Sequence, residues 1–490
     1  MQAIDRKLLR DFVRLWAQGL AIALVLAAGV TVIIMSVGMS RALNESREAY
    51  YAQNRFADLF AAARRAPDSL IRDIRSIPGV MEVDAQVRNY ATLDIPGRAK
   101  PATGLLLSYN AAQPPVLNIP ILRSGNWPER AGEVVVNEPF ADANGFRIGD
   151  AFAVNLNGRK REFRISGTAL SPEFIYTIGP GALMPQNETF GILWLSDALV
   201  DAAYNMEGAF NDISLALLPG ANATDVAEDV DRLLYPYGGR DTVDRSEQQS
   251  NAFLDAEIQQ LEVLAYVLPP VFLGISVFLV NMVVGRIVFL ERSEIGLMKA
   301  IGYSSWDICL HYLMLAGLIA LVGIAIGMVS GSWLARSMAA LYARYYDFPF
   351  LVFGVPGSVY AASALLALAA TSVGALRSAV KAARLAPAIA MSPPAPPNFR
   401  RSVFDSLADL FRLSQPARMI LRSLSRWPVR AATTLIGVAL AVSTLVASSF
   451  FPDAVDDIID KGFYQCRVPA RSSGQSPMRS GFCEQDQTFR

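Results

Sequence analysis

The sequence has very few of the residues from which catalytic and metal sites are most often built. Its 490 residues include three cysteines and one histidine, His311. Three cysteines give no disulfide framework, and a single histidine excludes sites that need several. A Ser-His-Asp triad would require His311 among convergent partners. We therefore interpret His311 as an interfacial residue at the end of an apolar run.

Other absences exclude whole classes of function. No lysine is followed by serine or threonine, so the chain has no Walker A loop to hold a nucleotide phosphate. The 44 basic residues are balanced by 44 acidic ones, and this balance argues against a nucleic-acid partner, which needs a basic surface. We expect neither a cofactor nor a metal, and no enzymatic activity of the chain's own.

Apolar runs are what the sequence does contain. It is 52% hydrophobic with a mean hydropathy of +0.30. A helix crosses a bilayer with about 20 mostly apolar residues. Runs that qualify are residues 19–38, 263–285, 310–334, 359–376 and 435–451, and the last two are short. We expect four to five spans, the first an uncleaved anchor because its apolar core exceeds that of a signal peptide.

The positive-inside rule orients these spans. Arg6, Lys7, Arg10 and Arg14 precede the first run, so the N-terminus is expected in the cytoplasm. The long segment between the first two spans then lies outside. It mixes short apolar or alternating runs with helical stretches. The predicted fold is an α-helical transmembrane bundle of four to five spans with one large α+β extracytoplasmic domain between spans one and two.

Elements within this outer segment follow from turn residues and periodicity. A helix is expected over residues 67–76 with Pro67 in its first turn, and another over residues 224–234. A stalk helix over residues 246–266 should continue into the second span. Strands are expected at residues 80–93, 133–136, 151–156, 163–168, 191–195 and 212–217.

Residues 291–303 form a short charged segment between two apolar runs. Glu294, Met298 and Ile301 recur at helical spacing, and so do Arg292, Ile295 and Lys299, which predicts an amphipathic helix. Gly302 suits its C-terminal break. The segment could be an ordinary cytoplasmic loop. Because few such loops hold a compact helix with an apolar stripe beside charges of both signs, we favour a helix that docks a partner.

The third apolar run carries glycines four residues apart, Gly323, Gly327 and Gly331. Such a strip lets another helix approach closely. Small residues are common in spans, so the pattern predicts close helix packing and leaves a specific dimer seam open.

The start of the chain recurs near its end. Arg6, Arg10 and Arg14 before the first run have the same spacing as Arg418, Arg422 and Arg426 before residues 431–451. Basic residues precede many spans, but the matched spacing favours a duplicated unit, as in many transporters. After residue 463 the sequence has no helical or strand period. The alternatives are a disordered tail and a truncated or frameshifted one, and we favour the second.

Residues 291–296 and 299–302, with the run that follows, resemble the coupling segment of the FtsX/MacB-like permeases of ABC transporters. Residues 383–390 are similar to the family's closing motif. Residues 77–80, 125–127 with 133–137, and 147–150 resemble its MacB-like periplasmic core domain. The resemblance extends to about residue 463. The expected organisation is an N-terminal helix and first span (1–41), a periplasmic core domain (42–245), a stalk and FtsX-like permease domain (246–390), a linker (391–417), the start of a second repeat (418–452) and a tail (453–490).

The resemblance implies a function that the composition alone does not indicate. A separate cytoplasmic ABC ATPase dimer would clamp the coupling helix and move the outer domain, exporting or extracting lipid, lipoprotein or peptide-like substrates across the cell inner membrane. The alternative is an FtsX-type signalling scaffold that regulates a periplasmic partner such as a cell-wall hydrolase. Membrane lipid, a periplasmic adaptor and a second permease unit are further expected partners. Coupling is assigned to Glu291, Arg292, Glu294, Ile295, Gly296, Met298, Lys299, Ile301 and Gly302.

Overall fold

The computed structural model describes residues 3–387 except 99, 183 and 351–353, together with isolated residues beyond 387. Apart from those isolated positions, the expected linker (391–417), second repeat (418–452) and tail (453–490) lie outside the described residues. The chain divides into two compact units. One comprises Met1–Leu273 with Leu315–Thr371, and the other Gly274–Met314 with Ser372–Arg490. Each unit is described by itself.

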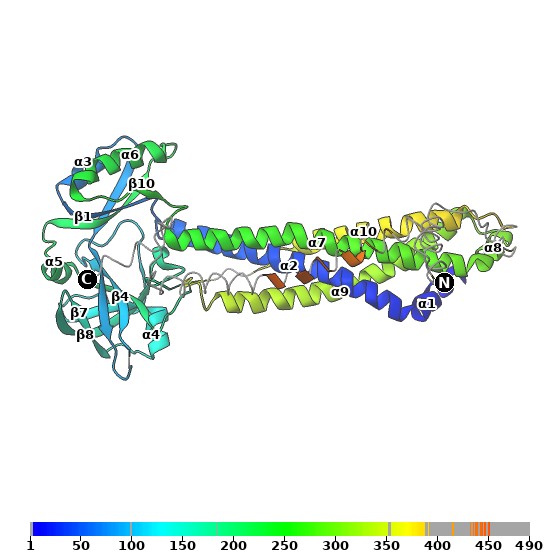
Figure 1. Ribbon diagram of the computed structural model, residues 1–490, viewed down its shortest axis with the longest axis horizontal. Helices are drawn as coiled ribbons and strands as arrows, with labels where there is room; N and C mark the ends of the chain where they lie inside the picture. Colours follow the sequence, from blue (N-terminus) through cyan, green and yellow to red (C-terminus); the bar gives the residue numbers. More distant parts are fainter. Residues whose placement is uncertain are drawn as a thin grey trace. The chain divides into compact units, whose positions relative to one another are not determined.

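The first unit contains a domain of two lobes, here called the two-lobed domain, that follows the first long helix (Figure 1). One lobe is an antiparallel sheet in the order β11-β1-β10-β2. Leu59, Ile74, Phe210, Ile213 and Val230 belong to its buried core, because two helices pack on one face of the sheet. The elements are β1 (Leu59–Pro67), β2 (Val80–Gln86), β10 (Ala209–Leu217), β11 (Val243–Asp244), α3 (Leu70–Arg75), α6 (Ala223–Leu234) and the 3-10 turn Tyr235–Tyr237.

The other lobe is a seven-stranded mixed sheet in the order β5-β8-β6-β9-β4-β3-β7. The long strand β8 also pairs with β7, so the sheet closes on itself and removes most of its open edges. Two short helices cover it. The elements are β3 (Arg88–Asp94), β4 (Ala102–Tyr109), β5 (Ile121–Gly125), β6 (Glu133–Asn137), α4 (Glu138–Asn144), β7 (Ala151–Leu156), β8 (Arg159–Leu170), the 3-10 turn Pro172–Phe174, β9 (Phe190–Ser196) and α5 (Asp197–Tyr204).

Gly125 ends β5 at a point where no side chain fits. Its φ is +77°, and a Cβ there would lie 2.1 Å from the carbonyl oxygen of Ser166. Only glycine combines this backbone conformation with so close an approach. The next residues lead to Trp127, whose ring stacks on Tyr109 with centroids 4.1 Å apart. The glycine therefore allows the close approach of β5 to β8 that precedes the Trp127–Tyr109 stack.

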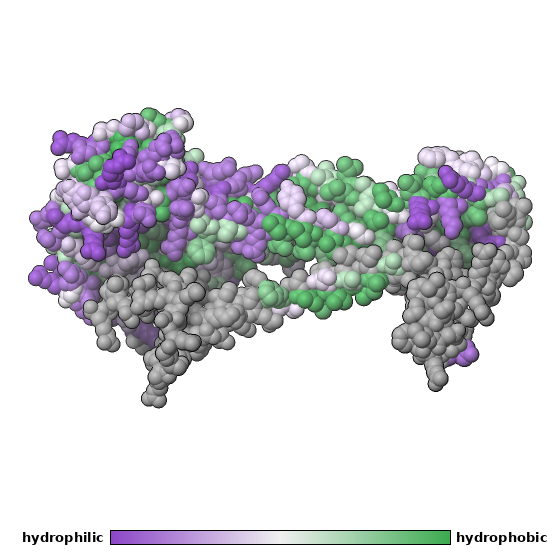
Figure 2. Space-filling view, turned by 45° about the horizontal axis from the view of Figure 1, so that its top comes forward, coloured by the Kyte–Doolittle hydropathy of each residue, from purple (hydrophilic) through white to green (hydrophobic). Residues whose placement is uncertain are grey.

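Four described helices are long and apolar enough to cross a membrane. They are α2 (Trp16–Gln53), α7 (Gln249–Leu290), α9 (Ser305–Tyr342) and α10 (Gly357–Ala383); the short helix α1 (Ala3–Arg14) precedes them. Hydrophobic residues gather along the long helices, whereas hydrophilic ones dominate the two-lobed domain (Figure 2). The stalk prediction is confirmed, since α7 is one helix with Pro269 and Pro270 inside it. The expected boundary at residue 42 falls inside α2.

Within the first unit, α2 and α9 approach closely along the glycine strip. Cβ atoms added at Gly323, Gly327 and Gly331 would lie 2.8 Å from Ala23 O, 2.7 Å from Val30 Cβ and 3.0 Å from Ile34 Cβ. The Thr31 and Ser330 hydroxyls share a hydrogen bond of 2.6 Å beside the strip. The missing side chains thus let two backbones meet and bring a polar pair together between apolar surfaces.

In the second unit, the end of α7 packs on the small residues of α10. A Cβ at Gly374 would lie 2.6 Å from Val277 O, and the Ser378 hydroxyl donates to the Asn281 carbonyl at 3.3 Å. Between α7 and α9 the chain forms the short helix α8 (Arg292–Ala300). Gly302 follows it with a φ of +111°, a conformation that favours glycine and ends the helix.

The predicted strands at residues 133–136, 151–156, 163–168, 191–195 and 212–217 are confirmed, and so is the helix at 224–234. The helix predicted from Pro67 is wrong at its start. Pro67 is the last residue of β1, and the helix spans only Leu70–Arg75. Pairing of β1 with β10 decides this, because tertiary hydrogen bonds outweigh the weak local preference of a proline for a helix start.

We expect Gly327→Ala to destabilise the chain, because the new methyl group would meet both Val30 and the Ala27 carbonyl, 2.9 Å from its Cβ. Overpacking of this kind costs roughly 1–3 kcal/mol. Thermal unfolding of the purified full chain in detergent measures it. The control is Gly317→Ala on the same helix, where nothing lies within 4 Å. Equal melting temperatures for the two variants would contradict the close approach.

Candidate functional site

The first candidate site is α8, whose two faces differ in burial. Ile295 and Gly296 are buried, while Glu294, Leu297 and Ile301 are exposed, with Leu297 at 52% and Ile301 at 71%. Residues three and four apart share a helix face, so these three form one surface, here called the α8 face. A large apolar side chain that faces solvent beside a charge is typical of a protein-docking surface.

The buried side of α8 is tied to its own unit. Lys299 donates through Nζ to the carbonyl oxygens of Ala383 and Leu385, the latter at 2.9 Å. A cation at the C-terminus of a helix stabilises it by its charge and by satisfying free carbonyls. Glu291, only 9% exposed, accepts a hydrogen bond from the Tyr312 hydroxyl at 3.3 Å. Lys299 and Glu291 therefore anchor α8 at both ends.

The structure places the other predicted coupling residues around this anchored helix. Arg292, Met298 and Lys299 are half-buried, and Gly302 follows the helix at its exposed end. His311 is buried, at 3% exposure, rather than at a surface. Within the part of the chain that the structure describes, no group of three or more His, Cys, Asp or Glu side chains could hold a metal.

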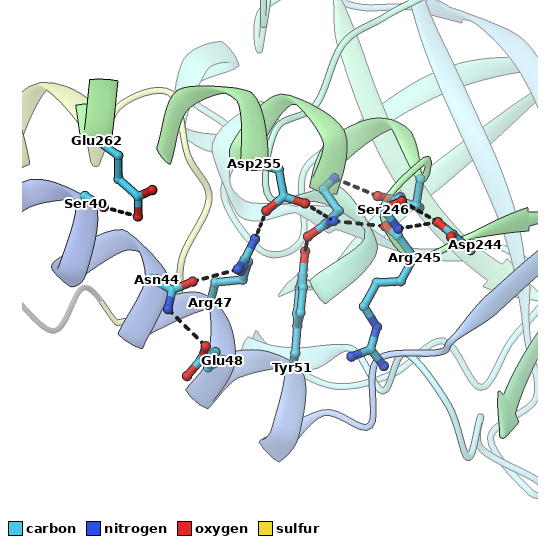
Figure 3. Close-up of polar contacts among 12 residues, drawn as sticks. Ser40, Asn44, Arg47, Glu48, Tyr51, Asp244, Arg245, Ser246, Asp255 and Glu262 are labelled. Carbon is cyan, nitrogen blue, oxygen red and sulfur yellow. Dashed lines mark hydrogen bonds and ion pairs between the residues drawn. The ribbon is translucent and has the colours of Figure 1, made fainter. Parts of the chain in front are cut away.

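The second candidate site joins α2 and α7 in the first unit through polar pairs (Figure 3). Ser40 donates to Glu262 at 3.4 Å, Arg47 pairs with Asp255, and the Tyr51 hydroxyl donates to Asn251 at 3.0 Å. We call these three pairs the stalk contacts. They follow one another along both helices, so each is a cross-connection that a sliding of α2 against α7 would break.

The start of α7 is attached to the two-lobed domain by Arg245. Its guanidinium donates to the carbonyl oxygens of Ala57 and Phe56 at 3.0 and 2.7 Å and pairs with Asp58 at 2.8 Å. Asn251 donates to the Arg245 carbonyl at 2.9 Å and to Asp255 at 2.9 Å. The stalk contacts therefore continue into the chain that begins the first sheet.

A turn at residues 171–177, here called the junction turn, connects the closed lobe to the same helices. Gln248 donates to the Glu173 carbonyl at 2.9 Å, and the Ser250 hydroxyl accepts from the Tyr176 backbone at 2.8 Å. The Asp347 backbone, just after α9, donates to the Ile175 carbonyl at 2.7 Å. Ile175 is fully buried in a cluster with residues of α2, α7 and α9. Movement of these helix ends must reach the turn.

The junction turn also holds the two lobes together through a buried charge. Arg88 of β3 pairs with Glu173 at 2.7 Å and with Asp212 of β10 at 3.2 Å. Burial opposes its charge, but the carboxylates of Asp212 and Glu173 outweigh burial and raise the pKa of Arg88. Burial raises the pKa of Glu173, and Arg88 opposes that rise. The Asn211 side chain accepts a hydrogen bond from the Arg88 backbone N–H at 2.7 Å and donates one to the Arg88 carbonyl at 2.8 Å. The arginine is therefore held by contacts from both lobes.

Between the lobes lies a cleft of about 400 Å³. Its lining includes the carboxylates of Asp84, Glu173, Asp197 and Asp201 and the ring of Tyr109. Burial, with Asp197, Asp68 and Glu207 nearby, raises the pKa of Asp201 to about 6. The cleft is therefore acidic, and its walls belong to the two lobes that Arg88 joins.

Two family profiles match consecutive parts of the chain. The MacB-like periplasmic core domain matches residues 20–233, and the FtsX-like permease C-terminal domain matches residues 266–387. The chain belongs to the FtsX/MacB-like permease family. Such permeases are multi-pass membrane components of ABC transporters that work with a cytoplasmic ATPase. No curated protein matches the chain.

Three solved structures are similar to parts of this permease. The periplasmic region of MacB from Actinobacillus actinomycetemcomitans is 12% identical and covers 42% of this chain and 92% of its own, with a TM-score of 0.27. The extracellular domain of the ABC-type transporter YknZ from Gram-positive bacteria is 10% identical over 38% and 97%, with a TM-score of 0.26. A domain of a permease protein from Porphyromonas gingivalis is 13% identical over 40% and 87%, with a TM-score of 0.25.

Sequence reasoning missed the stalk contacts and the junction turn of this permease. Asn44, Arg47, Glu48 and Tyr51 continue the helical register of the first span with no breaker before Gln53. That unbroken register was a signal that α2 extends beyond the apolar run. Nothing in the sequence indicated that Glu173 would meet Arg88, because 85 residues separate them.

We expect Asp255→Asn to destabilise the permease by roughly 1–3 kcal/mol, since it leaves Arg47 without its charged partner in a half-buried position. Hydrogen exchange of peptides from residues 40–53 and 249–262 measures the loss locally. The control is Asp94→Asn, whose partner Lys160 is mostly exposed and whose pair should contribute little. Equal protection in both variants would show that the stalk contacts are not stabilising.

We expect Asp201 to make the two-lobed domain more stable at low pH. Its folded pKa of about 6 lies above the ordinary value of 3.8, so between these values the folded state binds more protons than the unfolded state. The contribution is complete below about pH 4 and is lost as the pH rises to about 6. Hydrogen exchange of α5, compared at each pH between wild type and Asp201→Asn, should show the variant relatively more protected at pH 7 than at pH 4. Asp197→Asn should lower the folded-state pKa of Asp201 and so narrow the pH range over which the stability changes. A difference in protection between wild type and Asp201→Asn that does not vary with pH would refute the assignment of this effect to Asp201.

Proposed function

We propose that this chain is the permease subunit of an ABC transporter that couples ATP hydrolysis by a separate cytoplasmic ATPase to motion of its two-lobed domain. The observation that carries the proposal is the α8 face, an exposed Glu294-Leu297-Ile301 surface on a helix anchored through Glu291 and Lys299. An ATPase that grips this surface would move a fixed helix rather than a loose loop.

Chain connectivity supports the second half of this proposal. Glu291 follows directly on α7, which is a single helix from Gln249 to Leu290. The start of α7 contacts the junction turn through Ser250 and through Gln248, the residue just before the helix. A force on α8 is therefore applied to the end of the same helix whose other end contacts the two-lobed domain. The site residues are a docking surface and a mechanical connection, with no role in bond making or breaking.

The finer assignments extend this mechanism. We propose that the N-terminus and α8 are cytoplasmic, that the membrane is a cell inner membrane, and that the substrates are lipids, lipoproteins or peptide-like molecules. The junction turn also favours a second role. Since motion would arrive at the two-lobed domain itself, the chain could act as an FtsX-type scaffold that regulates a periplasmic partner such as a cell-wall hydrolase.

We expect Leu297→Asp to weaken the ATPase complex by about 2 kcal/mol, or roughly thirtyfold, as for a buried interface anchor. Co-purification with the ABC ATPase that accompanies the wild-type chain, and stimulation of its ATP hydrolysis in nanodiscs, are the measurements. Leu218→Asp is the control, because Leu218 is exposed to a similar degree, 48%, but lies in the two-lobed domain.

Two outcomes separate the proposed roles. Unchanged co-purification and stimulation in Leu297→Asp would reject the docking surface. If the surface is confirmed but ATP hydrolysis moves no lipid or peptide-like substrate out of proteoliposomes, the scaffold role is the better description. A pull-down with the full chain, selecting for proteins that bind the two-lobed domain, then identifies the regulated partner.

A further inference from the structure

The helix α10 presents a second, unexplained surface in the second unit. Its small residues, among them Gly374 and Ser378, face α7 and are used in packing. Outside this contact the helix carries larger, mostly exposed side chains spaced three and four residues apart, which places them on neighbouring parts of its surface. This α10 face consists of the apolar residues Val373, Leu376 and Val380 and the cations Arg377, Lys381 and Arg384.

The α10 face borders a hollow. Together with Leu385, its six residues line one side of an open hollow of about 700 Å³. Val373 is 64% exposed and Leu376 48% exposed, and both lie on the membrane side of the cations along the helix. The hollow is thus bordered by apolar residues at Val373 and Leu376 and by a mixture of basic and apolar residues from Arg377 onward.

The three cations have no counter-charge among the residues that the structure describes, where the side chains of Arg377, Lys381 and Arg384 form neither an ion pair nor a hydrogen bond. Lys299 already donates to the carbonyls of Ala383 and Leu385 at this helix end. Like charges three and four residues apart repel one another. An anion bound between them would remove that repulsion.

We propose that the α10 face binds a membrane phospholipid with an anionic headgroup, independently of the coupling role of α8. Arg377, Lys381 and Arg384 hold the headgroup phosphate, since guanidinium and ammonium groups make strong charge-assisted hydrogen bonds to phosphate oxygens. An acyl chain lies along Val373, Leu376 and Val380. Basic residues at the end of a transmembrane helix, next to apolar ones, are a recurrent arrangement for anionic lipids.

Native mass spectrometry of the purified full chain tests this, with added phosphatidylglycerol compared against phosphatidylcholine. The wild type should retain phosphatidylglycerol preferentially. The triple variant Arg377→Gln, Lys381→Gln, Arg384→Gln should bind it about tenfold more weakly or worse. Arg159→Gln, Arg161→Gln, Arg164→Gln is the charge-matched control, because these exposed cations lie on β8 of the two-lobed domain, and it should bind as the wild type does.

Two further variants separate a lipid site from a change in folding or in net charge. Arg377→Lys keeps the positive charge and should retain binding, whereas Val380→Trp keeps all three cations but fills the apolar part of the hollow and should lose it. Equal phosphatidylglycerol binding by wild type and the α10 triple variant would overturn the proposal. That is the result expected if another segment of the chain covers this face. Equal loss in the β8 control, or no preference over phosphatidylcholine, would overturn it too.

Discussion

The length of the helices is the constraint on which the rest of this structure depends. At 1.5 Å per residue, α2 and α7 are about 57 and 63 Å long, whereas the hydrocarbon core of a bilayer is about 30 Å thick. Each helix must therefore extend well beyond the membrane, where an exposed single helix has little to stabilise it. The stalk contacts meet this need, because Arg47, Asp255, Tyr51 and Asn251 give the extended ends partners in each other. Within the apolar runs, by contrast, the glycine strip joins α2 and α9 by close packing.

The same constraint explains why the junction turn is built from buried polar groups. If these helix ends carry force, as we propose, they need directional contacts, since apolar contacts can slide. Gln248, Ser250 and the Asp347 backbone each make a hydrogen bond to the turn, and Arg88 extends this connection to both lobes. A half-buried arginine paired with two carboxylates, of which Glu173 is buried, is costly to break singly. The lobes are thus held in one arrangement, with the acidic cleft between them.

Much of the architecture could be predicted before the structure was known. Apolar runs indicated the four long apolar helices among the described residues, alternation indicated most strands, and the period of residues 291–303 indicated α8. Prediction failed where long-range pairing competes with local preference. Pro67 looked like a helix start and is the end of β1. The strands β1 and β5, whose hydrogen bonds go to strands distant in sequence, were not predicted. Within α8 the period placed residues on two stripes but did not say which stripe is buried, and Ile295 and Gly296 proved to be the covered ones.

The sequence by itself determined that this chain spans a membrane, carries an α+β domain and contains no Walker A loop, because hydrophobic length, periodicity and motif residues are local properties of a chain. Only the tertiary structure decided which residues connect these parts. Lys299 was predicted as a coupling residue, and in the structure it donates to the Leu385 carbonyl at the end of α10. Arg88 and Glu173 belong to no recognisable sequence pattern, and their ion pair joins both lobes. The physical reason is that a polar group's role depends on the partner it meets when buried, and that partner is chosen by the fold.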